Sequence, residues 1–221
     1  VLIPRKYIGF IDEELALVKT VYSDIVDYVI VKNTNVKTYL SSSKIEEIKA
    51  LDFDKLVVMD KLKPSQFINL ARELKRDVVD RIMVILEIFA NHAGSRDALL
   101  QVELARLKHT LPLIKEAIRY AKLGELHGFL GAGRYGYEKY YTMLKKREAR
   151  VRRELEKLRL IRSIRRKARL EAGLPHVVIV GYTCAGKTSL FNVLTGLSKP
   201  VGPEPFTTLS PKSFRVSYRA V

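Results

Sequence analysis

The sequence contains one cysteine and no tryptophan, and its acidic residues are far fewer than its basic ones. A single cysteine cannot form an internal disulfide, which excludes a cystine-stabilised secreted domain and indicates a reducing compartment. The longest apolar run, residues 82–90, is interrupted by Glu87 and is too short to cross a bilayer. The early residues show no signal peptide, so we expect a cytoplasmic protein without a membrane span.

The basic excess is large and local. The 221 residues carry 40 Lys+Arg and 24 Asp+Glu, a net charge of +16, and residues 145–169 alone hold 13 Lys+Arg against 3 Glu. This bias predicts a polyanionic partner, which is RNA, DNA or an anionic membrane, and the membrane is disfavoured because the apolar positions here are aliphatic. A solvated helix face is the alternative. The candidate RNA contacts are Arg134, Lys145, Lys146, Arg150, Arg152, Arg153, Arg165 and Arg166.

Residues 1–94 predict a small α/β subdomain, because short β-rich runs alternate with amphipathic helical runs. The Ser41–Ser43 cluster can cap one of the helices, and Pro64 suits the first turn of another. The sheet should be small and parallel or mixed, with helices on its faces. The expected strands are 5–10, 26–31, 56–59 and 78–79, and the expected helices are 12–21, 42–50, 64–74 and 81–93.

Residues 95–172 predict an antiparallel helical hairpin. Apolar residues at alternating spacings of four and three form a coiled-coil seam, and the basic stretch has an apolar stripe of its own. Pro112 lies inside the first helix and should kink or restart it, with Thr110 available as a cap. The seam is Leu100, Leu104, Leu107, Leu111, Ile114, Ile118 and Ala121, and the second stripe is Leu144, Val151, Leu155, Leu158 and Ile161.

The connection between the two helices is rich in glycine. Residues 124–136 contain five glycines, interleaved with or followed by His127, Arg134, Tyr135 and Tyr137. Glycine at this density destabilises a helix, so we expect a flexible tip. Arginine and aromatic side chains on such a tip can stack on unpaired bases, while a plain loop is the alternative.

Residues 173–221 contain a motif that predicts phosphate binding. A buried-type strand, His176–Val180, leads into GYTCAGKT, which fits the phosphate loop G-x-x-x-x-G-K-[ST], and a helical run follows. Lys187 should reach the β- and γ-phosphates as the catalytic lysine, and the Thr188 hydroxyl should ligate Mg²⁺. The expected nucleotide-binding residues of this loop are Gly181, Tyr182, Thr183, Cys184, Ala185, Gly186, Lys187, Thr188 and Ser189.

Two further features belong to this segment. Cys184 could be a catalytic thiol, but no His–Asn partnership is evident, and a small residue lending its amide is the simpler interpretation. Downstream, Phe206, Thr207 and Thr208 precede an alternating run at 213–221 that predicts a strand. A threonine in this position suits a switch segment, in which the Thr208 hydroxyl completes the Mg²⁺ shell and senses the γ-phosphate.

Several segments resemble the HflX family of translational GTPases. KTYLSSSKIEEI (37–48) and the stretch from residue 55 to 81 are similar to family motifs, as is SRDALLQVELARLKHTLPLI (95–114) with its proline. GYTCAGKTSLFNVLTG and PFTTLSP are similar to the family's G-Y-T-N-A-G-K-S-T-L-F-N-x-L-T and F-A-T-L-D-P. The likeness covers nearly the whole chain, and the basic character of the sequence suggests an archaeal-type member.

The resemblance implies an α/β subdomain at 1–94, a helical hairpin at 95–172 and, from 173, the start of a Ras-like GTPase domain. It also implies a protein that hydrolyses GTP with Mg²⁺ and binds the large ribosomal subunit and its rRNA. Such proteins regulate, rescue or split ribosomes, with the hairpin tip reaching toward the peptidyl-transferase region. We expect a monomer that is cytoplasmic and ribosome-associated.

Three departures from the family matter. RYGYEKYY (134–141) replaces the family's G-P-G-E-T-Q-L-E, so tip contacts do not carry over. Cys184 replaces an asparagine that, in related GTPases, helps to hold an activating potassium ion, which predicts weak K⁺ stimulation.

The third departure is that neither D-x-x-G, which senses the γ-phosphate through Mg²⁺, nor N-K-x-D, which reads guanine, occurs in the 221 residues. We therefore expect a chain truncated within its GTPase domain and inactive on its own, in which the residues present do not distinguish GTP from ATP. A non-enzymatic basic RNA-binding module with a vestigial phosphate loop is the main alternative, and an unrelated P-loop ATPase or kinase is the other.

Overall fold

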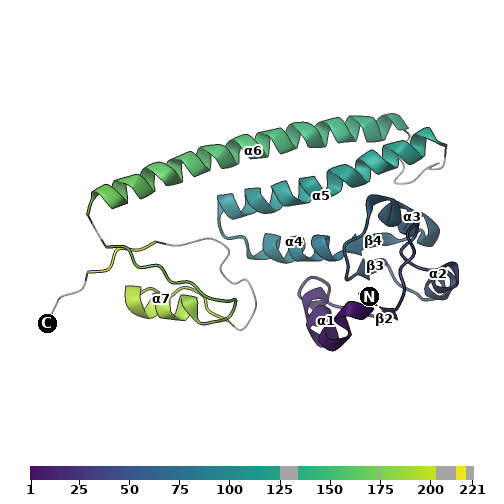
Figure 1. The fold of residues 1–221 in the computed structure, drawn as a ribbon, viewed down its shortest axis with the longest axis horizontal. Coiled ribbons are helices and arrows are strands. Elements are labelled where there is room, and N and C mark those ends of the chain that lie inside the picture. Colours follow the sequence, from purple (N-terminus) through teal and green to yellow (C-terminus); the bar gives the residue numbers. More distant parts are fainter. Residues whose placement is uncertain (125–133, 174, 203–212, 218–221) are drawn as a thin grey trace. The chain divides into compact units, whose positions relative to one another are not determined.

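A computed structural model describes residues 1–124, 134–173, 175–202 and 213–217 (Figure 1). The chain divides into two compact units, residues 1–88 with 104–150 and residues 89–103 with 151–221. The first unit holds a parallel sheet and most of the long hairpin. The second holds the base of the hairpin and the segment with the phosphate-loop motif. In the described residues, no helix has the length and apolarity needed to span a bilayer.

The first unit is built on a four-stranded parallel sheet in the order β2-β1-β3-β4. The strands are β1 (Leu2–Pro4), β2 (Val29–Val31), β3 (Lys55–Val58) and β4 (Asp77–Asp80). The apolar residues of β1 and β3 are almost wholly buried, as expected for central strands covered on both faces. The α/β prediction for this part of the chain is confirmed.

Short helices connect the strands: η1 (Arg5–Phe10, a 3₁₀ helix), α1 (Ile11–Lys19), α2 (Ser42–Lys49), α3 (Pro64–Leu74) and α4 (Arg81–His92). The predicted start signals are confirmed, since Ser41 caps α2 through its hydroxyl and Pro64 opens α3. Helices α2 and α3 bury their apolar faces against the sheet, and Ile45, Ile48 and Leu70 are all less than 5% exposed.

The first strand lies earlier than predicted. Residues 5–10 were expected as a strand, but they form η1, which buries none of its side chains, and the strand is Leu2–Pro4. The physical reason is apolarity, because Leu2 and Ile3 are 0–1% exposed whereas Ile8 and Phe10 are about half exposed. The second strand is shorter than predicted for a related reason. The strand begins at Val29 and not at Val26, whose side chain is 72% exposed. Between them, the Asp27 carboxylate accepts a hydrogen bond from the Tyr28 amide.

Two long helices follow, α5 (Arg96–Lys122) and α6 (Arg134–Glu171). In the first unit Lys122 pairs with Glu138, and in the second Arg96 pairs with Glu154. Low numbers on α5 therefore meet high numbers on α6, so the two helices run antiparallel. The predicted seams lie mainly inward, since Leu107, Leu111, Leu144, Val151 and Leu155 are at most 6% exposed.

The proline in α5 does not restart the helix. Pro112 lies inside one continuous helix from Arg96 to Lys122, so the predicted restart and the Thr110 cap are wrong. Pro112 removes one amide donor, a loss that a long helix can absorb when its neighbours are packed. Leu111 and Ile114, on either side of it, are buried at 6% and 9% exposure.

The helices α4, α5 and α3 are joined by polar contacts within the first unit. Nε2 of His109, on α5, lies 3.0 Å from Oδ1 of the fully buried Asp80 at the end of β4. Asp80 also accepts bonds from the amides of Met83 (3.0 Å) and Leu62 (3.4 Å). Asn69 on α3 donates to the Tyr120 hydroxyl on α5 at 3.2 Å. These contacts hold α5 against α3 and the end of β4.

Candidate functional site

The predicted phosphate loop leads directly into α7 (Lys187–Thr195). Gly186 precedes the helix with φ of 76°, a left-handed conformation that glycine adopts without strain. The Leu190 amide donates to the Gly186 carbonyl at 2.9 Å and closes the first helical turn. The first amides of α7 have no acceptor within the helix, and the helix dipole makes this end favourable for an anion.

The lysine of the motif folds back across the loop. Nζ of Lys187 donates to the Tyr182 carbonyl, and the Ala185 amide donates to the same carbonyl at 3.3 Å. Residues 182–185 are therefore drawn into a tight turn with an ammonium group held over it. This places a cation beside the helix N-terminus, where a polyphosphate would need one.

Cys184 occupies the centre of the turn in a strained conformation. Its φ is 59°, in the left-handed region that residues other than glycine adopt rarely. The cysteine is exposed and not in a disulfide. In the described residues no group of three or more His, Cys, Asp or Glu could hold a metal ion.

The end of α7 is also fixed in place. Gly196 ends the helix with φ of 69°, and the chain then turns back along it. The Asn192 side chain accepts a bond from the Lys199 amide at 3.1 Å and donates to the Lys199 carbonyl at 2.9 Å. This reciprocal pair ties the segment that leads toward the predicted switch to the phosphate-loop helix.

The strand predicted before the loop is not formed. Residues 176–180 have no regular structure, and Val177, Val178 and Val180 are 77–88% exposed. A strand exists only through hydrogen bonds to a neighbour, and no described segment pairs with this one. The second predicted strand is wrong for the same reason over its described part, Ser213–Ser217. The predicted switch residues Phe206, Thr207 and Thr208 lie outside the described residues.

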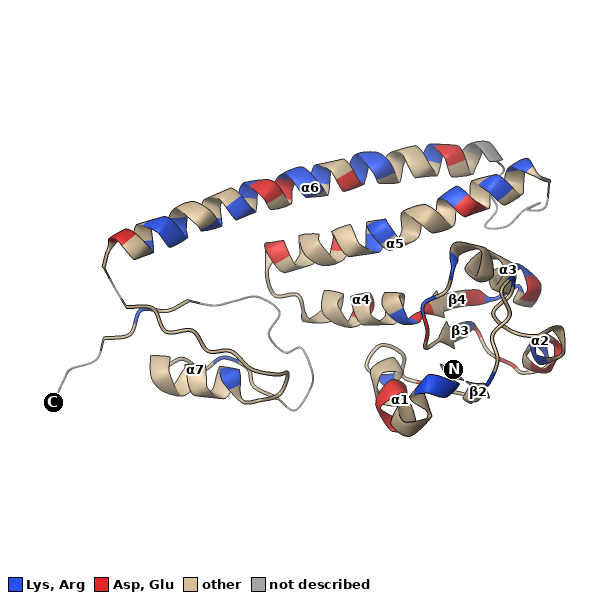
Figure 2. Ribbon diagram, viewed as in Figure 1, with Lys and Arg blue, Asp and Glu red and all other residues tan. Residues whose placement is uncertain are grey.

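The candidate RNA contacts lie along α6 (Figure 2). Lys146, Arg150, Arg165 and Arg166 are exposed and make no ion pair with any described residue. Lys145 lies 3.3 Å from Glu148, while Arg152 and Arg153 are exposed but already engaged with neighbours. Arg134 is the first residue of α6. The helix thus presents a run of unneutralised cations to solvent.

Part of the predicted tip is helix and core. Residues 134–137 belong to α6, and Tyr137 is 2% exposed against Ile68 and Ala117. Tyr137 is therefore not available to stack on bases, contrary to the prediction. Helix α6 contains Gly136 because packing of this turn outweighs the low helix propensity of glycine. Residues 125–133, with His127, lie outside the described part of the chain.

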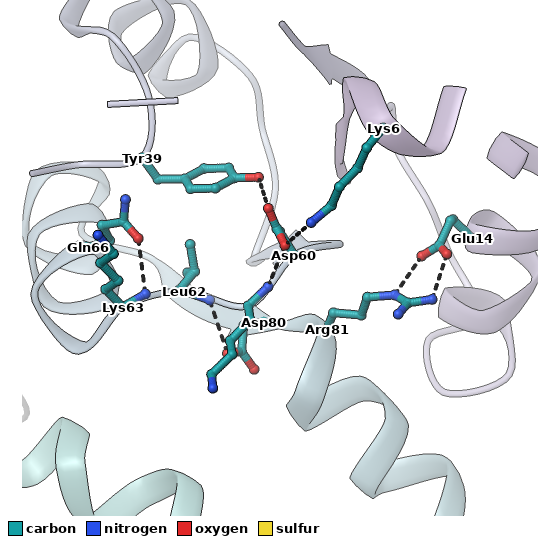
Figure 3. A network of polar contacts seen from close by, with 10 residues as sticks. Lys6, Glu14, Tyr39, Asp60, Leu62, Lys63, Gln66, Asp80 and Arg81 are labelled. Atoms are coloured by element: carbon teal, nitrogen blue, oxygen red, sulfur yellow. Dashed lines mark hydrogen bonds and ion pairs between the residues drawn. The ribbon is translucent and has the colours of Figure 1, made fainter. Parts of the chain in front are cut away.

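Sequence reasoning missed a polar cluster in the first unit (Figure 3). Lys6 and Asp60 pair at 2.7 Å, and the Tyr39 hydroxyl donates to Asp60 at 3.1 Å. Arg81 binds both carboxylate oxygens of Glu14, at 2.7 and 3.0 Å. Asp60 lies two residues after β3 and Arg81 directly follows β4, positions where polar residues often signal a binding edge. That signal was present in the sequence.

Three family models match consecutive parts of the chain. Residues 10–90 match the GTP-binding GTPase N-terminal model, residues 92–169 the GTP-binding GTPase middle region, and residues 176–220 the 50S ribosome-binding GTPase model. The junction at 90–92 lies at the end of α4, and the junction at 169–176 includes the end of α6.

The chain is also similar to curated relatives called GTPase HflX. One from Hyperthermus butylicus is 46% identical over 216 residues, and one from Saccharolobus solfataricus is 43% identical over 210 residues. The matches cover 95% and 94% of this chain but 58% and 59% of those relatives. The chain thus spans less than two thirds of their length.

Solved structures agree with these relatives. A GTP-binding protein from Sulfolobus solfataricus, crystallised in complex with GDP, is 36% identical, with a TM-score of 0.55. The alignment covers 89% of this chain and 52% of that one. A second GDP complex gives a TM-score of 0.59 at 35% identity, covering 89% of this chain and 54% of that one. With family models matching from residue 10 to residue 220, these similarities show that the chain belongs to the HflX family of GTPases.

Proposed function

We propose that the protein binds GTP at the loop Gly181–Thr188 and, with a complete GTPase domain, hydrolyses it to GDP. The observation that carries this proposal is the turn at 182–185, with the Lys187 ammonium held over it and the N-terminus of α7 behind it. The GDP bound in two similar structures supports a guanine nucleotide.

Each residue of the loop has a role in this proposal. Lys187 would exchange the Tyr182 carbonyl for the β- and γ-phosphates and balance their charge. The Thr188 hydroxyl, in the first turn of α7, suits one position in a Mg²⁺ shell, and Thr208 would supply another. The backbone amides of residues 181–189 would donate to phosphate oxygens. Phe206 and Thr207 would flank the nucleotide.

The test is titration of the full-length protein with fluorescent GTP, GDP and ATP. Lys187→Ala should weaken guanine-nucleotide binding at least tenfold, because the main cation at the phosphates is removed. Lys115→Ala removes an exposed lysine on α5 and serves as the matched control. Unchanged GTP affinity in Lys187→Ala would favour a vestigial loop on a non-enzymatic RNA-binding module.

We further propose that the exposed basic residues of α6 bind the large ribosomal subunit through rRNA, and that the protein then regulates or splits ribosomes according to its nucleotide state. The exposed, unpaired cations Lys146, Arg150, Arg165 and Arg166 carry this part. Folded RNA is a dense polyanion, and cations without an internal partner are free to neutralise its phosphates. The matching 50S ribosome-binding GTPase model supports the same partner and a cytoplasmic location.

Sedimentation with purified large subunits tests the docking surface. Arg165→Glu with Arg166→Glu should weaken cosedimentation in every nucleotide state, because charge on the docking face is reversed. Lys108→Glu with Lys115→Glu makes the same charge change on exposed positions of α5 and is the control. Equal losses in the two double variants would show a general charge effect and contradict the assignment of the surface to α6.

A further inference from the structure

The parallel sheet has an apolar cavity at the edge where its strands begin. The cavity has a volume of about 550 Å³ and is lined by the first residues of β1, β2 and β3. Its walls come from two connections within the first unit, the one between α1 and β2 and the one between α2 and β3. The polar cluster of Lys6, Asp60 and Arg81 lies at the opposite edge, beyond the ends of the strands.

The buried part of this cavity is apolar, and its charged part is exposed. The buried lining residues are all at most 5% exposed, and they are Leu2, Val18, Ile48, Leu56 and Val57. The charged lining residues all lie exposed at the rim. An apolar centre inside a polar rim is typical of protein–protein interfaces, whereas a small-molecule site places polar groups among its apolar walls to orient the ligand.

Apolar side chains in the walls of the cavity remain open to solvent. Val26, between α1 and β2, is 72% exposed, and Leu51, between α2 and β3, is 39% exposed. Ile25 and Phe53, beside them in the sequence, are only partly buried. Exposed apolar groups enclosed by a polar rim mark interaction sites, because covering them removes apolar surface from water.

Four aspartates surround this apolar surface, and they are Asp24, Asp27, Asp52 and Asp54. All four are exposed, and none forms an ion pair with a described lysine or arginine. The one basic residue among the described lining residues, Lys55, lies instead over a tyrosine ring, 5.1 Å from its centroid. On a chain with a net charge of +16, this acidic rim is a local exception, and it favours a cationic partner.

The same aspartates argue against two other occupants. The phosphates of RNA would be repelled by four carboxylates, so this surface is distinct from the basic residues of α6. No set of three or more His, Cys, Asp or Glu side chains in the described part of the chain is placed to hold a metal ion. The carboxylates are therefore spread around the rim, where separate cationic side chains can reach them.

We propose that this cavity docks a basic polypeptide segment of a partner protein. An apolar side chain of the segment packs on Val18 and Ile48, and the lysines and arginines that flank it pair with the aspartates of the rim. The buried apolar anchor supplies most of the affinity, while the charges speed association and select basic partners. This protein contact adds to the RNA contact proposed for α6 and does not depend on it.

The test is fluorescence anisotropy of a labelled nine-residue peptide of lysine and serine with two leucines at its centre, titrated with the full-length protein. Asp52→Asn with Asp54→Asn should weaken binding by about fivefold, because two charges of the rim are removed. Glu13→Gln with Glu73→Gln removes two exposed carboxylates outside the cavity and is the matched control. Added KCl should weaken binding to the wild-type protein, because salt screens exposed charges.

A second pair of variants tests the apolar part of the site. Val26→Ser with Leu51→Ser should weaken binding of the peptide by about tenfold, because the apolar contact area is lost. Val36→Ser with Leu99→Ser changes residues that are 74% and 49% exposed outside the cavity, and it should leave binding unchanged. A peptide with serines in place of the two leucines should also bind about tenfold more weakly. Thermal unfolding checks that all variants are folded.

Several results would overturn the proposal. Absence of peptide binding, or equal binding of the two peptides, would leave only general attraction to carboxylates. Equal affinity in either double variant and its control would place the contact elsewhere. Tighter binding of a linear tetraamine would identify a small organic cation, and self-association lost in the Val26/Leu51 variant would identify a second copy of the chain. GTP titration and cosedimentation through α6 test the proposed function separately, so the proposals fail independently.

Discussion

At the scale of single residues, Cys184 is the position where this chain departs most informatively from its family. Its φ of 59° places it in the left-handed region, which asparagine tolerates better than most residues. The family's asparagine therefore fits this backbone without rearrangement. A thiol is a poor ligand for K⁺, a hard cation that prefers oxygen.

We expect GTP hydrolysis by the full-length protein to be similar in K⁺ and Na⁺, and Cys184→Asn to introduce a preference for K⁺. The reason is that the carboxamide oxygen supplies the ligand that the thiol lacks. Rates measured in matched KCl and NaCl buffers check this, with Cys184→Ser as a control of similar size. A large K⁺ preference in the wild-type protein would contradict it.

Asp80 is a second residue with a clear energetic role. It is fully buried and accepts the Met83 and Leu62 amides while Nε2 of His109 lies 3.0 Å away. Asp80→Ala should lower the free energy of unfolding by about 2–3 kcal/mol, because a helix cap is lost and buried donors are left unpaired. Urea unfolding measures this, and Asp77→Ala, exposed at the other end of β4, should change it by less than about 0.5 kcal/mol.

Residue roles that depend on local chain chemistry could be predicted, and those that depend on tertiary contacts could not. The Ser41 cap and the opening of α3 at Pro64 follow from their immediate neighbours and were confirmed. The contact of Asp80 with His109 joins residues 29 positions apart, and nothing in the sequence around either residue indicates that the two would meet. Tyr39 likewise meets Asp60 only because the loop after β2 folds over the sheet edge.

At the scale of elements, Tyr137 anchors the hairpin to the sheet layer. It is 2% exposed and packs with Ile68 of α3 and Ala117 of α5. Tyr137→Ala should cost about 3 kcal/mol, since a buried aromatic side chain is replaced by a cavity. Tyr140→Ala, on the same helix but 43% exposed, is the matched control. If both variants unfold at the same urea concentration, Tyr137 does not stabilise the packing of the hairpin as stated.

Element boundaries failed where a strand needed partners that the local pattern does not reveal. Residues 5–10 alternate like a strand, yet the more apolar Leu2–Pro4 takes the central position and residues 5–10 become η1. Residues 176–180 have strong β-propensity but no neighbouring strand among the described segments. Helices were predicted more accurately because their hydrogen bonds are internal, which is why α5 and α6 could be expected from their seams.

At the scale of the whole molecule, the phosphate loop lacks the support that catalysis needs. Val177, Val178 and Val180 are 77–88% exposed and α7 buries no residue, so this part of the second unit has no core of its own. The 221-residue chain alone should therefore hydrolyse GTP poorly or not at all, measured as phosphate release against the full-length protein. Normal turnover by the 221-residue chain would contradict this.

The net charge of +16 should make ribosome binding steeply dependent on salt. If six cations of α6 contact single-stranded phosphates, the logarithm of the association constant should fall with the logarithm of salt concentration with a slope of about −4. Arg165→Glu with Arg166→Glu should make that slope shallower by about 1.4, because two phosphate contacts are lost and fewer counterions are released on binding. Cosedimentation across a KCl series measures both slopes. A slope near zero for the wild-type protein would mean that α6 binds by apolar contacts or not at all, since Coulombic attachment to RNA is screened by salt.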